Sequence, residues 1–180
     1  SPPFRLPGEH FAAGAVFLLL AAGGLGWVAP ELASGMYPSP RLVAVTHLFT
    51  LGWITLSIFG ALYQFMPVAL GEPVRSQRLA HVTFALYVPG LLAFVAGMAS
   101  GIQPLMLAGA ATFGTGVFLF CGNLAATLWK ARRRDLTWWS LLAADLYLFL
   151  TAVLGLLLAT NLRIGFMGVG RWTALGVHIH

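Results

Sequence analysis

The chain has 180 residues, of which 59% are hydrophobic and only 8% are charged. So few charges cannot cover a water-soluble domain of this length, so the composition is that of an α-helical integral membrane protein. The formal net charge of +5 does not indicate a nucleic-acid partner, because the ten Lys and Arg residues lie in short segments between apolar runs, where they contact anionic lipid headgroups.

Five apolar runs are each long enough to cross a hydrocarbon core, which takes roughly 20 helical residues. A sixth run begins near Trp172 and reaches His180 after too few residues to cross. We therefore expect one all-α domain over residues 1–180, a polytopic transmembrane helix bundle with five complete spans and the start of a sixth, and we interpret it as a fragment or half of a longer chain. The five spans are expected at Phe11–Ala29, Leu42–Met66, His81–Ala99, Leu105–Trp129 and Trp138–Thr160.

The first and third spans open next to histidines, His10 and His81. Both positions lie at a predicted boundary between lipid and water. We expect water and lipid headgroups to satisfy these two rings, with a haem held between them as the alternative.

The second span carries a histidine inside an apolar stretch, in Thr46-His47-Leu48-Phe49-Thr50-Leu51-Gly52-Trp53. His47 lies six residues after Arg41, and His178 lies seven residues after Arg171, so both are roughly 10 Å along their helices from the same boundary. Two neutral imidazoles at one depth on facing helices can hold a haem iron between them. The alternative for His47 is an interfacial ring that is hydrogen-bonded to a backbone carbonyl or to Thr50.

The last three residues are His178, Ile179 and His180. Residues two apart on a helix point about 200° from one another, so one small site cannot easily take both rings. The pair is instead suited to two sites on opposite faces of a helix, for example one haem and a second haem or metal. The alternative is that both are ordinary polar residues at the end of the chain.

Three further polar side chains lie in or beside the fifth span. Asp145 is costly to bury in lipid, and we expect it to pair with the loop of Arg132 to Arg134 or to cap a neighbouring backbone. The alternative is a polar cluster with Gln64 and Asn123, which would serve as a proton entry or a quinone headgroup site. Arg163 and Arg171 flank the connection that precedes the His-x-His segment. They are placed to bind haem propionates, or alternatively lipid phosphate.

Three segments together resemble haem-copper oxidase subunit I-like membrane proteins, including the NnrS-type relatives. They are the stretch around His47 given above, its continuation Ile58-Phe59-Gly60-Ala61-Leu62-Tyr63-Gln64-Phe65-Met66-Pro67, and Val177-His178-Ile179-His180. The resemblance implies that His47 is an axial ligand of a low-spin haem b. It also implies that His178 or His180 lies opposite, with the remaining histidine facing a second centre.

The chain also departs from that family. It has no His-Pro-Glu-Val-Tyr-like segment and no adjacent His-His pair, which are the family's usual copper ligands. Copper is therefore possible by resemblance but unsupported by this chain, as is an oxygen-reducing centre, and whether the chain is part of a haem-containing oxidoreductase stays open.

The resemblance leads us to expect a haem-b-binding membrane subunit in electron transfer or in respiratory or nitric-oxide chemistry. Its partners would be membrane lipid, other membrane subunits or the rest of the chain, and a cytochrome or quinone electron donor. A non-catalytic structural subunit of a larger complex is the alternative.

The distribution of positive charge predicts the orientation of the chain. Lys and Arg near span ends resist translocation, so the side that carries more of them is cytoplasmic. Seven lie on the amino-terminal side and three on the opposite side, which places the amino terminus in the cytoplasm of a bacterial cell, with the chain in the inner membrane. The seven are Arg5, Arg75, Arg78, Lys130, Arg132, Arg133 and Arg134, and the three are Arg41, Arg163 and Arg171.

Overall fold

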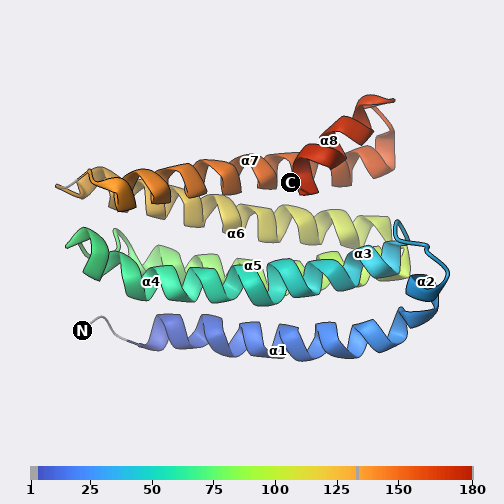
Figure 1. Ribbon diagram of the computed structural model, residues 1–180, viewed down its shortest axis with the longest axis horizontal. Coiled ribbons are helices and arrows are strands. Elements are labelled where there is room, and N and C mark those ends of the chain that lie inside the picture. The colour runs from blue at the N-terminus through green and yellow to red at the C-terminus, as the bar shows by residue number, and fades with distance from the viewer. Residues whose placement is uncertain (1–3, 133, 180) are drawn as a thin grey trace.

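The computed structural model describes residues 4–132 and 134–179, and this part of the chain is helical without any strand. The helices run back and forth along one long axis (Figure 1). In chain order they are α1 (Arg5–Trp27), α2 (Ala29–Ala33), α3 (Pro40–His47), the π-helix η1 (Leu48–Thr55), α4 (Leu56–Leu70), α5 (Gln77–Ser100), α6 (Gln103–Lys130), α7 (Leu136–Ile164) and α8 (Gly170–Ile179).

Five of these helical units are long and apolar enough to cross a membrane, which confirms the predicted number. They are α1, the continuous unit α3–η1–α4 over Pro40–Leu70, α5, α6 and α7. Each overlaps one of the five predicted spans and extends beyond it at one end or at both. The run that begins near Trp172 forms the ten-residue helix α8.

The helix ends follow from local chemistry. Side-chain oxygens of Ser39, Ser76 and Asp135 accept hydrogen bonds, each of 3.1 Å, from backbone N–H groups three residues later, and so begin α3, α5 and α7. Glycines in the left-handed conformation end α4, α5 and α7, at φ values of 67°, 74° and 65°. A residue with a Cβ atom would be strained at those three turns.

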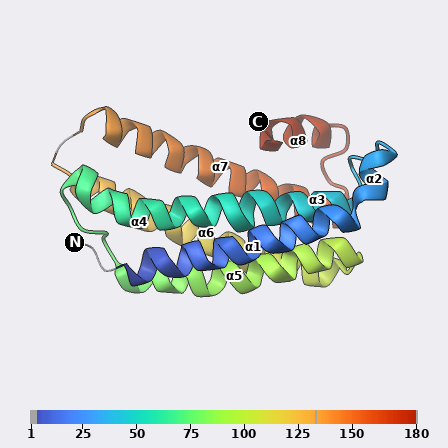
Figure 2. The ribbon, with the colours of Figure 1, turned by 60° about the horizontal axis from the view of Figure 1, so that its bottom comes forward.

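The packing of the helices is uneven. The unit α3–η1–α4 lies against α1, and its α3 portion also contacts α5; α5 and α6 form the most extensive pair. Helix α7 packs on α6, and α8 folds back along α7 (Figures 1 and 2). A single large core of buried apolar residues joins these helices, with Phe59 of α4 stacked on Phe120 of α6 at 3.7 Å between ring centroids.

The positive charges gather at the two ends of the bundle. Arg5, Arg75 and Arg78 lie at the end where α1 begins, together with Lys130, Arg132 and Arg134 of the α6–α7 connection. We call this the amino end. The opposite end carries Arg41, Arg163 and Arg171. Arg133 lies outside the described residues.

Candidate functional site

His47 is the last residue of α3 and is half-buried. Its Nδ1 lies 2.7 Å from the backbone oxygen of Val43, and its ring meets the ring of Phe94 of α5 edge-on, at 5.3 Å between centroids. Because a carbonyl oxygen can only accept, Nδ1 carries the proton and the neutral ring keeps its lone pair on Nε2. The backbone hydrogen bond expected for an interfacial ring is thus present, and it leaves Nε2 available as a ligand.

The eight residues after His47 form a π-helix, which the sequence analysis did not anticipate. π-Helical segments are rare in proteins overall, but those that occur are often found at functional sites. The wider turn breaks the regular hydrogen-bond pattern of the α-helix there. Two hydroxyls satisfy its carbonyls: Thr55 donates to the oxygen of Thr50, and Tyr87 of α5 donates to that of Leu51, each at 3.0 Å. No local pattern in the sequence predicts this π-helix, because the hydroxyl of Tyr87 that bonds to it comes from another helix.

His178 lies on α8 and packs against α7. Its Nδ1 is 3.2 Å from the backbone oxygen of Thr151, so its neutral ring also keeps the lone pair on Nε2. Gly155, one turn further along α7, makes room for the ring, since a Cβ atom there would lie 3.0 Å from Cε1 of His178.

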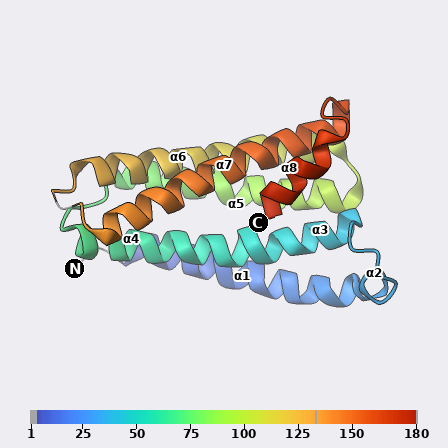
Figure 3. The same cartoon turned by 45° about the horizontal axis from the view of Figure 1, so that its top comes forward.

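The structure brings His47 and His178 into the same region. Figure 3 shows how this arises: α8 leaves the far end of α7 and slants back, so that its C-terminal end points toward the side of α3 and α4. His180 lies outside the described residues.

Arg163 and Arg171 also come together. Both line a pocket of about 400 Å³ at the end of the bundle opposite the amino end, with Asn161 and the turn glycines Gly165 and Gly168. The side-chain oxygen of Asn161 accepts a hydrogen bond of 2.8 Å from the N–H of Met167, which holds the turn in shape. Neither arginine forms an ion pair with any residue that the structure describes, so both guanidinium groups can bind an anion.

These donors fit a haem better than a bare metal ion. In the described part of the chain, no three side chains of His, Cys, Asp or Glu cluster as an ion held by protein alone would require. A haem iron needs only two axial ligands from the protein. His47 and His178 provide two imidazoles whose tautomers are fixed by backbone carbonyls, the usual support for a metal-bound histidine.

Asp145 does not form the expected pair, and one oxygen of its carboxylate is buried without a hydrogen-bond partner among the described residues. It is 6% exposed between α6 and α7, and Cys121 of α6 approaches it, with Sγ 3.9 Å from its backbone oxygen. Asp145 forms no ion pair with Arg132, Arg134 or any other described residue. Pairing with those two arginines was therefore wrong: they project from the connection before α7, and Asp145 lies more than two turns inside it.

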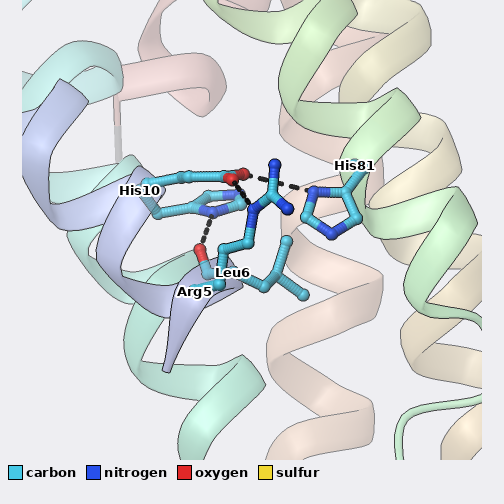
Figure 4. A network of polar contacts seen from close by, with 5 residues as sticks. Arg5, Leu6, His10 and His81 are labelled. Atoms are coloured by element: carbon cyan, nitrogen blue, oxygen red, sulfur yellow. Dashed lines mark hydrogen bonds and ion pairs between the residues drawn. The ribbon is translucent and has the colours of Figure 1, made fainter. Parts of the chain in front are cut away.

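The two histidines of the amino end behave differently from one another. His81 is partly exposed, and its Nδ1 lies 3.2 Å from a carboxylate oxygen of Glu9, which also binds Arg5 at 3.0 Å (Figure 4). His10 is fully buried instead of meeting water at a boundary, so that expectation was wrong for it. The cause is Gly60 of α4, whose missing side chain lets α1 approach with His10 at the contact.

Comparison of the chain with protein-family models, with curated proteins and with solved structures gives no match. The resemblance to haem-copper oxidase subunit I-like proteins therefore stays a prediction from the residues quoted above.

Proposed function

We propose that the chain is a haem-b-binding subunit of a membrane, crossing it with its five long helices, and that it takes part in electron transfer or in respiratory or nitric-oxide chemistry. The observation that carries the proposal is the pair His47 and His178. They come from helices far apart in the sequence, the helix that carries His178 slants back toward α3 and α4 (Figure 3), and each ring has Nδ1 bonded to a backbone carbonyl.

The residues of the chain have separate tasks in this proposal. His47 and either His178 or His180 would hold the haem iron through ring nitrogens, and the carbonyls of Val43 and Thr151 orient the rings of His47 and His178. A bound haem supplies one-electron transfer.

Two further groups of side chains shape the surroundings of the haem. Phe94 and the apolar side chains around it exclude water, which helps set the reduction potential. Arg163 and Arg171, which line the pocket at the same end of the bundle, would neutralise the propionates.

The surroundings of the subunit belong to the same proposal. The excess of Arg and Lys at the amino end supports an orientation with that end in the cytoplasm, in the inner membrane of a bacterium. The large apolar side chains left exposed on α7 would contact lipid, other subunits or the remainder of a longer chain. A cytochrome or a quinone would deliver the electrons.

A reduced-minus-oxidised optical spectrum of the purified protein tests the haem. Sharp α and β bands of a bis-histidine haem are expected, with stoichiometric iron, and His47→Ala should abolish them. His81→Ala is the matched control, because that ring is paired with Glu9 at the amino end, and its bands should persist. Comparing His178→Ala with His180→Ala identifies the second ligand.

A non-catalytic structural subunit is the second candidate. It is favoured by the exposed apolar face of α7, which includes Leu146, Phe149 and Leu150. In that case the protein contains no stoichiometric iron and every histidine substitution is tolerated. Bands that survive both His47→Ala and His178→Ala would also remove the haem site proposed here.

A further inference from the structure

Five side-chain polar atoms of the described residues are buried without a hydrogen-bond partner, and three of them lie together at the amino end of the bundle. These three are Nε2 of His10 on α1, the hydroxyl of Tyr63 on α4 and the hydroxyl of Thr83 on α5. The three residues are 0%, 3% and 0% exposed. Within the described part of the chain, no side chain or backbone group is assigned a hydrogen bond to these three atoms. Buried polar atoms in folded proteins almost always have a hydrogen-bond partner.

The three atoms belong to one place. The rings of His10 and Tyr63 meet edge-on at 5.2 Å between centroids. Thr83 of α5 and Asn123 of α6 both lie near the hydroxyl of Tyr63, and the residue after Thr83, Phe84, packs against the His10 ring at 4.8 Å between centroids. The cluster is therefore built by side chains from three helices, and it lies apart from His47 and His178.

The hydrogen-bonding character of the cluster can be assigned. Nδ1 of His10 lies 2.8 Å from the backbone oxygen of Leu6, so it carries the proton and Nε2 is an acceptor (Figure 4). Each hydroxyl can donate one hydrogen bond and accept others. One acceptor and two hydroxyls match the hydrogen-bonding capacity of a water molecule, which makes two to four hydrogen bonds in a buried site.

An opening lies next to the cluster. A pocket of about 400 Å³ is present at the amino end, and its walls include Leu6, Tyr63, Glu72 and Gln77. Two of these residues also belong to the surroundings of His10: Leu6 accepts its Nδ1–H, and Tyr63 packs against its ring. Tyr63 thus belongs both to the wall of the pocket and to the cluster.

We propose that His10, Tyr63 and Thr83 together bind an ordered water molecule, which enters from this pocket. The water donates to Nε2 of His10 and accepts from the hydroxyl of Tyr63 or Thr83. A metal ion is a poorer occupant, because one nitrogen and two neutral hydroxyls are not a ligand set that transition metals prefer. The charged groups nearest to His10, Glu9 and His81, are already bonded to each other at the surface.

The site explains why one histidine of the amino end is buried and the other is not. His81 obtains its partner from Glu9 in the protein and remains partly exposed. His10 has a backbone partner for one nitrogen only, and the water supplies the other. Through this water, the buried His10 ring is hydrogen-bonded on the side of the pocket lined by Leu6 and Tyr63.

A double-mutant cycle on the intact chain in detergent tests the shared water. Tyr63→Phe and Thr83→Val should each lower the midpoint of thermal unfolding, because each leaves the water with one partner fewer. The double variant should lower it by clearly less than the sum, since the two changes remove one common ligand. Tyr147→Phe and Thr115→Val are the matched controls, because both residues are exposed, and their small effects should add.

Direct observation completes the test. A high-resolution structure of the unaltered protein should show density for a water within hydrogen-bond distance of Nε2 of His10 and of at least one hydroxyl, and the density should vanish in the double variant. Strictly additive midpoint shifts, an empty cluster, or a direct bond from Tyr63 to His10 would each overturn the proposal. The outcome does not depend on haem, so it leaves the proposed function untouched in either direction.

Discussion

Helices α6 and α7 are alike in sequence character and opposite in packing. Their most apolar stretches have mean hydropathies of 1.7 and 2.3, yet 44% of that stretch is buried inside the bundle in α6 and only 6% in α7. The more hydrophobic helix is thus the less buried one. Hydropathy reports suitability for lipid and does not report which helices touch.

Small residues account for the difference. Gly97 of α5 and Gly109 of α6 lie where the two backbones meet, and a Cβ atom at either would collide with backbone atoms of the other helix. Along α7 the single glycine inside the helix is Gly155, and it receives the side chain of His178 instead of a helix backbone. Close contact between apolar helices needs such positions, because van der Waals packing and not burial from water drives their association in lipid.

The largest expected difference in unfolding free energy is between two leucine truncations, one on α6 and one on α7. Leu128→Ala on α6 removes a side chain that is 1% exposed and should lower the free energy of unfolding by about 2–5 kcal/mol. Leu150→Ala on α7, where the side chain is 55% exposed, should change it by less than about 0.5 kcal/mol. Chemical denaturation in detergent measures both, and equal losses would mean that α7 is buried by a partner in the sample.

A methyl group tests the contact of α5 with α6. Gly109→Ala forces the backbone near Phe94 to move and should cost about 1–3 kcal/mol. Gly122→Ala is the control on the same helix, where nothing lies within 4 Å, and it should be neutral or stabilising by up to about 1 kcal/mol. The contrast in unfolding free energy would be lost if the two helices were further apart than described.

A tryptophan links α6 to α7 at the amino end. Trp138 is 5% exposed, and its Nε1 donates a hydrogen bond of 2.8 Å to the backbone oxygen of Leu128. Trp138→Phe should therefore cost about 1 kcal/mol for the bond, with a further loss from the smaller ring. Trp139→Phe, at a side chain that is 57% exposed, should leave the unfolding free energy nearly unchanged, and a larger effect there would assign the link to the wrong tryptophan.

The smallest expected change in stability is at the contact of α7 with α8. Gly155→Ala gains helix propensity, and it pushes the His178 ring by a few tenths of an ångström, so the net free-energy change should be within about 0.5 kcal/mol. Its readout is local: the imidazole resonances of His178, or the haem bands if haem is bound, should shift. Gly176→Ala on α8, with open space around it, should shift neither.

Sequence reasoning located the five long helices because each is a sustained apolar run bounded by turn formers, a signal that needs no knowledge of neighbours. It placed Arg163 and Arg171 in one region for the same reason: they flank a single connection. It did not anticipate the π-helix after His47, because the choice between helix types depends on tertiary partners such as Tyr87. The burial of His10 was missed because it depends on Gly60, fifty residues away.

The sequence by itself determined that the chain is a set of long apolar helices with basic residues at their ends, since length, hydropathy and turn chemistry are local properties. Only the tertiary structure decided which helices pack against one another, why α7 is left largely exposed, and how His178 reaches the region of His47. The physical reason is that apolar helices offer one another almost the same energy along any face. The contact is selected by where a glycine lets two backbones approach, and that depends on pairs of positions and not on any one stretch of sequence.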